Sequence, residues 1–523
     1  MILQIVSWAI VLVPTLAILA TMLVRSFKSG IAVQGLRTLF HLIAVAASFF
    51  IARALAPVVS KALIGSDFIL SVLHNAVESF VPESMVTSFV EQLAVGIAAP
   101  VLYLGALIVL EIAFVFLSAL IARPVKKAVS ARSWSAPLKL LSRISAISLA
   151  VVTAFAVSAL AIMPVTGLIG TISSVSKSLD EAEMTEKGAL AFAEELNACP
   201  VVEIVNTATG FVYDPLTECT IDGMTVSVSR DVPPSIPVLA SCVKQMQGMV
   251  NEMFSGDFKD ADLSVISKVG KEIESSDVAK IVFSTVMKGF AEAAEAGDVF
   301  LGIDFSETED DSTLNTLKVA LTAAFGDTTP FTVSEDMQIF ESAASSLQNT
   351  LKAFDAVNAD DKESSLQFFH KTFENMTPES AALAGEIVSG SLEIVADHLG
   401  EQMSGVTQLI QDVYTVMGDV KADDAVSEEK FNQEVVILNN LFSAAVAPSI
   451  ENIEDMVQSY SYSDAISSVI METVKAGSDP LGIASSLNDE AKSTLVNAVN
   501  DCKENGADVA KLDALLVFFG MGA

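Results

Sequence analysis

The sequence predicts an all-α protein built from an N-terminal four-helix transmembrane bundle, with interfacial amphipathic helices, and a mostly α-helical soluble domain with one small β-hairpin. Three observations predict this class. Four long apolar segments lie within the first 170 residues, the net charge changes sign near residue 170, and apolar residues recur every three or four positions in most of the remaining chain. At 523 residues the chain is also too long for one ordinary domain.

Net charge separates the two parts of the chain. Residues 1–170 hold 11 lysines and arginines against 5 acidic residues, a net charge of +6, and the remainder holds 19 against 59, a net charge of −40. This division explains how a chain with a pI near 4.3 has a mean hydropathy of +0.53. The acidic part lacks the basic surface that binding to a polyanion requires, so nucleic acid is excluded as a partner and a solvated surface is expected.

Four segments are long enough to cross a bilayer, which takes about 20 residues. The first segment has an apolar core longer than that of a signal peptide, and no cation precedes it. We therefore expect this segment to stay in the mature protein as a span. The predicted spans are residues 2–24, 38–59, 96–122 and 144–169. They define a membrane domain over residues 1–175, followed by a connecting region over 176–235 and an acidic helical domain over 236–523.

The segment between the second and third spans, residues 64–93, has a different pattern. Its apolar residues fall at helical spacing, acidic residues interrupt them, and Pro82 divides the segment. This pattern predicts two amphipathic helices that lie at the membrane interface instead of crossing it.

Cations in short loops beside the spans set the orientation, because such loops stay on the cytoplasmic side. The loop at 64–93 holds acidic residues and no cation, whereas the first and third loops are basic. Both termini are therefore expected outside the cytoplasm. The predicted topology anchors are Arg25, Lys28 and Arg37 in the first loop, and Arg123, Lys126, Lys127, Arg132, Lys139 and Arg143 in the third.

Small residues recur every fourth position in two of the spans. Such a stripe lets helix backbones approach closely, which is a usual source of affinity between membrane helices. We expect the two stripes to face each other in a compact bundle. They consist of Ala44, Ser48, Ala52 and Ala56 in the second span and of Ala146, Ala150, Ala154 and Ser158 in the fourth.

Glu111 lies well inside the third span, where a charge costs at least about 2.5 kcal/mol. Two interpretations remain open: a carboxylate that handles protons or ions, and a protonated or paired carboxyl that fastens the bundle. His41, in the second span, is a candidate partner for it. Arg53 lies at the opposite end of that span and is expected to extend to the outer interface.

The layout of these spans and loops resembles one known family. A short basic loop with glycines ("RSFKSGIAVQGLRTLF") precedes a span that continues into "IARALAPVVSKAL", a basic turn ("ARPVKKAV") follows the third span, and "PLKLLSR" leads to a fourth span that closes on Pro and Gly. Over residues 1–175 this is similar to the CvpA family of bacterial membrane proteins, named for colicin V production. The chain departs from the family at Ser142, Ser145 and Ala146, where members commonly have glycines.

The resemblance implies a non-enzymatic protein of the bacterial inner membrane, linked to toxin production or export and to the cell envelope. The expected partners are the lipid bilayer and unidentified envelope or export proteins. Two alternatives stay open. One is a small channel or transporter that uses Glu111, and the other is an extracytoplasmic interaction or structural module for which the spans serve only as an anchor.

The acidic part supplies few chemical signals. Asp222-Gly223 between alternating residues predicts a β-hairpin near 217–229, and Thr377-Pro378-Glu379 predicts a helix start. No sequence motif of a metal site, phosphate-binding loop or nucleophile–base pair is visible, so neither an enzyme nor a cofactor is expected. The even number of cysteines permits a disulfide among Cys199, Cys219 and Cys242, and burial as free thiols is the alternative.

Overall fold

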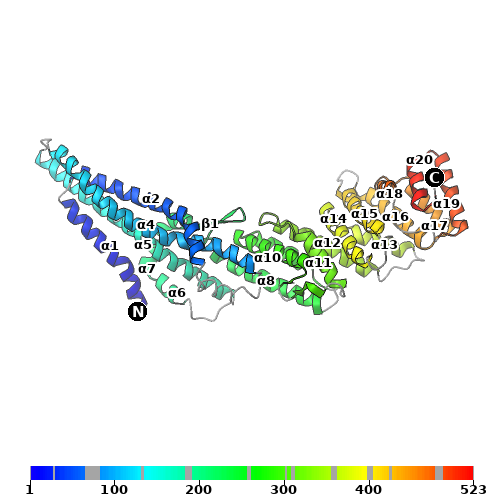
Figure 1. Ribbon diagram of the computed structural model, residues 1–523, viewed down its shortest axis with the longest axis horizontal. Coiled ribbons are helices and arrows are strands. Elements are labelled where there is room, and N and C mark those ends of the chain that lie inside the picture. Colours follow the sequence, from blue (N-terminus) through cyan, green and yellow to red (C-terminus); the bar gives the residue numbers. More distant parts are fainter. Residues whose placement is uncertain are drawn as a thin grey trace. The chain divides into compact units, whose positions relative to one another are not determined.

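The computed structural model describes residues 2–27, 30–64, 83–130, 135–182, 191–255, 261–300, 303–307, 312–354, 362–396, 404–422, 427–476 and 487–521. These residues are almost entirely helical, as predicted (Figure 1). They form two compact units. The first unit is Met1–Cys242 with Ser275–Val282, and the second is Val243–Glu274 with Phe283–Ala523.

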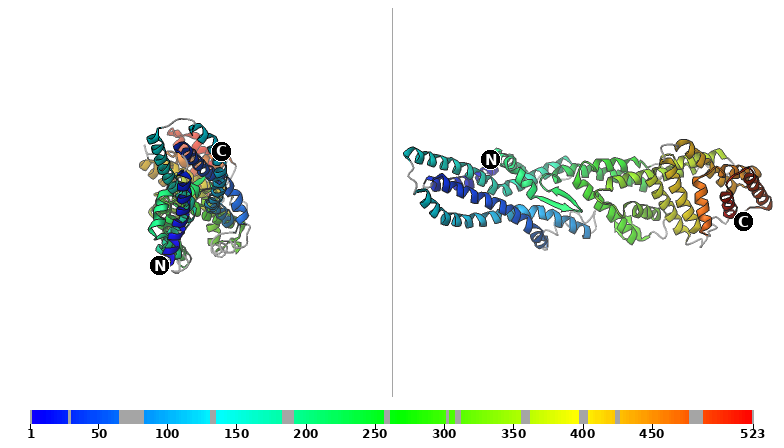
Figure 2. Two further views of the ribbon diagram at one scale, coloured as in Figure 1. Left: turned by 90° about the vertical axis from the view of Figure 1, so that its left-hand side faces the viewer. Right: turned by 90° about the horizontal axis from the view of Figure 1, so that it is seen from above.

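Four long helices make up most of the first unit. Each is long and apolar enough to cross a membrane, as the sequence predicted, and they run side by side (Figure 2). Their side chains leave much apolar surface exposed, as lipid-facing helices do. The elements of this unit are α1 (Ile2–Phe27), α2 (Ile31–Ile64), α4 (Glu83–Ser130), α5 (Ala136–Glu181), α6 (Ala191–Asn197), α7 (Pro200–Leu216), β1 (Glu218–Ile221) and β2 (Met224–Ser227). Helices α8 (Val232–Ser255) and α10 (Asp277–Ala296) contribute residues to both units.

The start of α4 differs from the expectation for residues 64–93. The helix begins at Glu83 and continues into the third span without a break, so the second of the two expected interfacial helices is instead the first part of α4. The boundary expected near Leu93 is therefore wrong: acidic residues such as Glu91 suggested it, but the helical spacing of the apolar residues continues across it. The first expected interfacial helix lies outside the described residues, as do Lys28 and Arg132.

The two stripes of small residues are buried, as expected, and most of their alanines lie in separate apolar clusters. In α2, Ala44 and Ala52 pack in a cluster with Tyr103 of α4. In α5, Ala150 and Ala154 pack in another cluster with Met22 of α1. These alanines thus support the packing of α2 with α4 and of α1 with α5, and a stripe by itself specifies close approach but not the partner. The remaining members, Ser48, Ala56, Ala146 and Ser158, are buried too.

Helices α6 and α7, in the expected connecting region, fold back against the spans. Ser7 Oγ of α1 donates a hydrogen bond to the Leu196 carbonyl oxygen at 3.3 Å. Val202 of α7 is buried in a cluster with Val11 of α1. Tyr213 lies so close to α5 that a Cβ at position 167 would stand 2.4 Å from its ring, which only glycine avoids. The connecting region is thus part of the first unit.

The predicted hairpin is confirmed. Strands β1 and β2 pair in antiparallel register with Ile221 opposite Met224, which leaves Asp222 and Gly223 as the two turn residues. Both have positive φ, 47° and 83°, as a two-residue turn between twisted strands requires. The hairpin buries Cys219 and Val226 in a small cluster with residues of α10.

The second unit is a helical domain with its own core. One continuous apolar cluster runs through all helices from α11 to α20. A second, very short hairpin joins Val299 to Asp304 and was not predicted. The elements are α9 (Ser264–Ile273), β3 (Val299–Phe300), β4 (Ile303–Asp304), η2 (Phe305–Glu307), α11 (Ser312–Phe325), α12 (Val333–Phe354), α13 (Lys362–Phe373), α14 (Pro378–Ala396), α15 (Ser404–Ala422), α16 (Ser427–Val446), α17 (Ile450–Tyr460), α18 (Ala465–Lys475), α19 (Asp489–Glu504) and α20 (Val509–Phe518).

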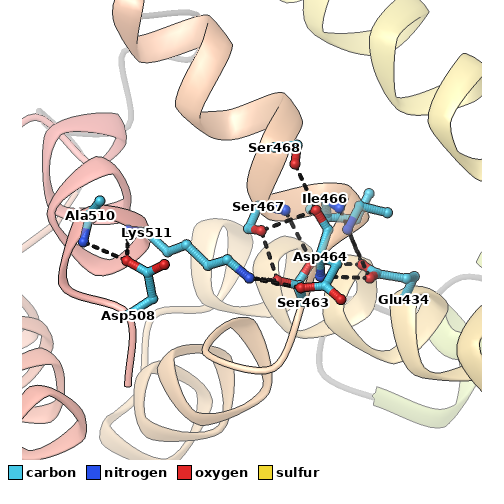
Figure 3. A network of polar contacts seen from close by, with 10 residues as sticks. Glu434, Ser463, Asp464, Ile466, Ser467, Ser468, Asp508, Ala510 and Lys511 are labelled. Carbon is cyan, nitrogen blue, oxygen red and sulfur yellow. Dashed lines mark hydrogen bonds and ion pairs between the residues drawn. The ribbon is translucent and has the colours of Figure 1, made fainter. Parts of the chain in front are cut away.

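A buried carboxylate fastens α16 to the start of α18 (Figure 3). Glu434 is 2% exposed and accepts a hydrogen bond from Ser463 Oγ at 2.7 Å. It also accepts bonds from the backbone N–H groups of Asp464, Ala465 and Ile466 at 3.1–3.2 Å. The first N–H groups of a helix have no partner within the helix, so this carboxylate satisfies donors that would otherwise be buried unpaired.

Candidate functional site

The structure brings together the two ionisable residues singled out within the spans. His41 of α2 and Glu111 of α4 meet with Nδ1 and Oε2 2.6 Å apart. Their side chains are 14% and 19% exposed. The pairing follows from the tight packing of α2 against α4, which places the two positions on facing sides. At this distance one proton is shared or the pair is ionic, and either state joins the two helices.

A cavity of about 380 Å³ adjoins this pair. All four long helices contribute to its wall, which is mostly apolar, and the pair itself forms part of that wall. Its volume lies within the range of about 300–1,000 Å³ that small-molecule sites occupy. The polar groups on the wall are those of Thr21, Arg25, Gln34, Arg37, His41, Glu111 and Ser118.

Two oxygens on residues of this wall are buried and accept no hydrogen bond from any group that the structure describes. One is Oε1 of Glu111, the oxygen that does not face His41, and the other is Oε1 of Gln34. Gln34 is only 2% exposed. A buried acceptor without a donor costs about 1–3 kcal/mol. Both residues line the cavity, although these two oxygens are themselves covered by neighbouring atoms.

Arg25 and Arg37 belong to the same wall. Arg37 Nη1 donates to the backbone carbonyl oxygen of Arg25 at 3.3 Å, near the C-terminal end of α1, where the helix dipole favours a cation. The sequence identified both arginines only as topology anchors. Their place on the cavity was missed, although Gln34, Arg37 and His41 follow one another at spacings of three and four, on one face of a helix.

The other residues singled out from the sequence lie away from this cavity. Arg123, Lys126 and Lys127 are exposed near the end of α4, and Lys139 and Arg143 are exposed near the start of α5. Arg53 Nη1 lies 3.3 Å from Glu218 Oε2, so Arg53 contacts the β-hairpin and does not only extend to an interface.

The cysteines are free thiols, so the structure does not contain the disulfide that the sequence permitted. Cys199, Cys219 and Cys242 are buried, and Cys502 is half-buried. Burial raises the pKa of the Cys219 thiol to about 11. The described residues contain no group of three or more histidine, cysteine or acidic side chains that could hold a metal ion.

Comparison with known proteins identifies no relative of the chain: no protein family, curated protein or solved structure matches it. The resemblance to the CvpA family therefore remains a prediction that rests on the layout of the spans and loops.

Proposed function

We propose that this chain is a small channel or transporter that conducts protons across a bacterial inner membrane, in which Glu111 and His41 exchange the proton. The observation that carries the proposal is the contact of 2.6 Å between these two side chains on the wall of a cavity lined by all four long helices. Ionisable residues within a membrane are costly, and those that face a cavity commonly mark an ion or proton pathway.

The chemistry of the pair suits proton exchange. Imidazole is the side chain that most readily gains and loses a proton at physiological pH, and a neighbouring carboxylate responds to that change. With His41 protonated and Glu111 ionised, the two attract each other across the α2–α4 contact. When a second proton neutralises Glu111, the attraction between opposite charges is lost and only a hydrogen bond from the His41 cation remains. Protonation would therefore change how firmly two walls of the cavity are held.

The basic loops support an orientation for the proposal. By the rule for positively charged segments beside spans, the end of α1 with Arg25 and the end of α4 with Lys126 lie at the cytoplasmic side, and both termini lie outside. Arg25 on α1 and Ser118 on α4 line the cavity close to these loops in the sequence. The cavity thus belongs to the cytoplasmic half of the bundle, and the acidic unit is extracytoplasmic.

Proton flux in reconstituted vesicles tests this function. Vesicles that contain the full chain and a trapped pH indicator are given an inside-negative potential, and proton entry is followed over time. We expect entry with the wild-type chain and loss of it with Glu111→Gln. Glu203→Gln, at an exposed position of α7, is the matched control and should retain the flux. Equal fluxes for the wild type, Glu111→Gln and empty vesicles would contradict the proposal.

A second candidate is an extracytoplasmic interaction or structural module, for which the spans serve only as an anchor. The CvpA-type role, which supports toxin production or export and envelope function through protein partners and without catalysis, stays a prediction from the layout of the spans. The observation that favours the module is the separate hydrophobic core of the second unit, which needs no membrane to form. Under this candidate the acidic unit binds partners and the spans act as its anchor. Exchanging the four spans for an unrelated anchor of the same orientation should then preserve function, whereas loss of function would favour the bundle as the active part.

A further inference from the structure

The cavity has two chemically different ends. Arg25, Arg37 and Gln34 lie near the connection between α1 and α2, and the rest of the wall is mainly apolar. Ile18 of α1, Leu107 of α4 and Val157 of α5 are examples of the apolar part. Such a wall suits a molecule with an anionic head and a hydrocarbon tail better than it suits a small hydrated ion.

The cavity also opens to the side of the bundle. Ile108 and Ile112 of α4 line it and are nevertheless 53% and 56% exposed. The opening exists because α1 packs mainly on α5, α6 and α7, whereas α2 and α4 pack on each other. In a bilayer that side of the bundle faces hydrocarbon, so a lipid tail could enter without crossing water.

We propose that the cavity binds an anionic phospholipid of the cytoplasmic leaflet. The phosphate would lie at the guanidinium groups of Arg25 and Arg37, and one acyl chain would extend along the apolar wall past Ile108. Arginine pairs phosphate oxygens through its planar fork of donors. The inference uses the cavity of the proposed function but does not depend on proton exchange.

The surroundings of the cavity favour the same ligand. The side chain of Ser142 in α5 accepts a hydrogen bond from the backbone N–H of Ile31 at 3.2 Å, which holds the start of α5 beside the start of α2. The exposed cation Arg143 follows Ser142 directly. Basic pockets between membrane helices on the cytoplasmic side are a known setting for anionic headgroups, because the cytoplasmic leaflet is itself anionic.

Lipid retention by the purified full chain tests the inference. The protein in detergent is titrated with phosphatidylglycerol or with phosphatidylcholine of the same acyl chains, and bound lipid is counted by native mass spectrometry. We expect one phosphatidylglycerol to be retained about tenfold more tightly than phosphatidylcholine. Arg25→Gln and Arg37→Gln, made singly, should each reduce this preference, and Arg123→Gln at an exposed position outside the cavity should preserve it.

Further variants separate the interpretations. Ile108→Trp keeps every charge and fills the side opening, so it should weaken retention of phosphatidylglycerol while the thermal unfolding midpoint stays close to that of the wild type.

Glycerol phosphate should not displace the lipid; efficient displacement would identify a soluble anion as the ligand and overturn the inference. Equal retention of the two lipids, or equal losses in the Arg25, Arg37 and Arg123 variants, would also overturn it. Glu111→Gln should retain the lipid even where proton flux is lost, which distinguishes failure of this inference from failure of the proposed function.

Discussion

Nδ1 of His41 and Oε2 of Glu111 lie 2.6 Å apart and join α2 to α4 inside the membrane bundle. The free Oε1 of Glu111 is buried without a donor among the described residues, on the wall of the cavity. A carboxyl group that only fastened two helices would be stabilised by satisfying both of its oxygens. The unpaired oxygen leaves Glu111 tied to the bundle through His41 alone among the described residues.

The two side chains should be energetically coupled. In a double-mutant cycle with His41→Ala and Glu111→Ala, we expect a coupling of about 0.5–3 kcal/mol, because each single change leaves the other polar group unpaired at the cavity. The free energy of unfolding in detergent micelles measures it. Additive effects of the two changes would show that the contact carries no energy.

Ala52 should be sensitive to size. It is fully buried in the cluster between α2 and α4, so Ala52→Leu should destabilise the bundle by about 1–3 kcal/mol through overpacking. Ala54 is exposed on the same helix, and Ala54→Leu is expected to be close to neutral. Unfolding in micelles compares the two variants. Equal stability of both would contradict close packing of α2 on α4.

Glu434 should be a main stabilising residue of the second unit. Glu434→Ala leaves the Ser463 hydroxyl and several N–H donors at the start of α18 without their acceptor, at a cost of about 2–4 kcal/mol. Glu429 is exposed on the same helix, and Glu429→Ala should change stability by less than about 0.5 kcal/mol. Thermal unfolding of the full chain measures both. A small effect at Glu434 would contradict its role at this helix start.

Cys219 should make the first unit sensitive to alkaline pH. Burial raises the pKa of its thiol to about 11, above the value of about 8.5 for an exposed thiol. The unfolded chain therefore releases this proton at lower pH than the folded protein does. The folded state keeps its full stability below the pKa of the unfolded thiol and loses stability as the pH rises from there toward 11. From pH 8 to 11 the wild type should therefore lose up to about 2 kcal/mol more than Cys219→Val. Parallel stability curves for the two proteins would contradict this expectation.

Cys502 offers a test of orientation. Among the four cysteines it alone is half-buried, and the others are buried. If the acidic unit is extracytoplasmic, a membrane-impermeant maleimide should label intact cells, and Cys502→Ala should abolish most of the label. Labelling that requires permeabilised cells would place the acidic unit in the cytoplasm and reverse the proposed topology.

Features set by local sequence were predictable. The spans follow from the length of uncharged segments, the hairpin follows from Asp222-Gly223, and α14 begins at Pro378 next to the expected Thr377 signal. Each depends on residues close together in the chain, so no knowledge of distant contacts was needed. The contact between His41 and Glu111 was also anticipated, because few partners for an intramembrane carboxyl exist in the spans.

Features set by distant contacts were not predictable. Nothing in the stripe of Ala150 and Ala154 specifies α1 as its partner instead of α2. The return of α7 onto α5 depends on Tyr213 meeting Gly167, two residues with no shared sequence signal. The cavity exists because α1 packs on α5 and leaves a space beside α2 and α4. The sequence does not specify this packing, so it identified Arg25 and Arg37 as topology anchors but not as residues of the cavity wall.

The central claim is that His41 and Glu111 exchange a proton within the membrane bundle, and infrared difference spectroscopy of the reconstituted protein tests it most directly. Spectra recorded between about pH 8 and about pH 5 cover the range in which a histidine site exchanges protons. The account predicts a carboxyl protonation band in the wild type that is absent in Glu111→Gln and altered in His41→Gln. Identical difference spectra for the wild type and Glu111→Gln would show that Glu111 does not exchange a proton and would contradict the claim.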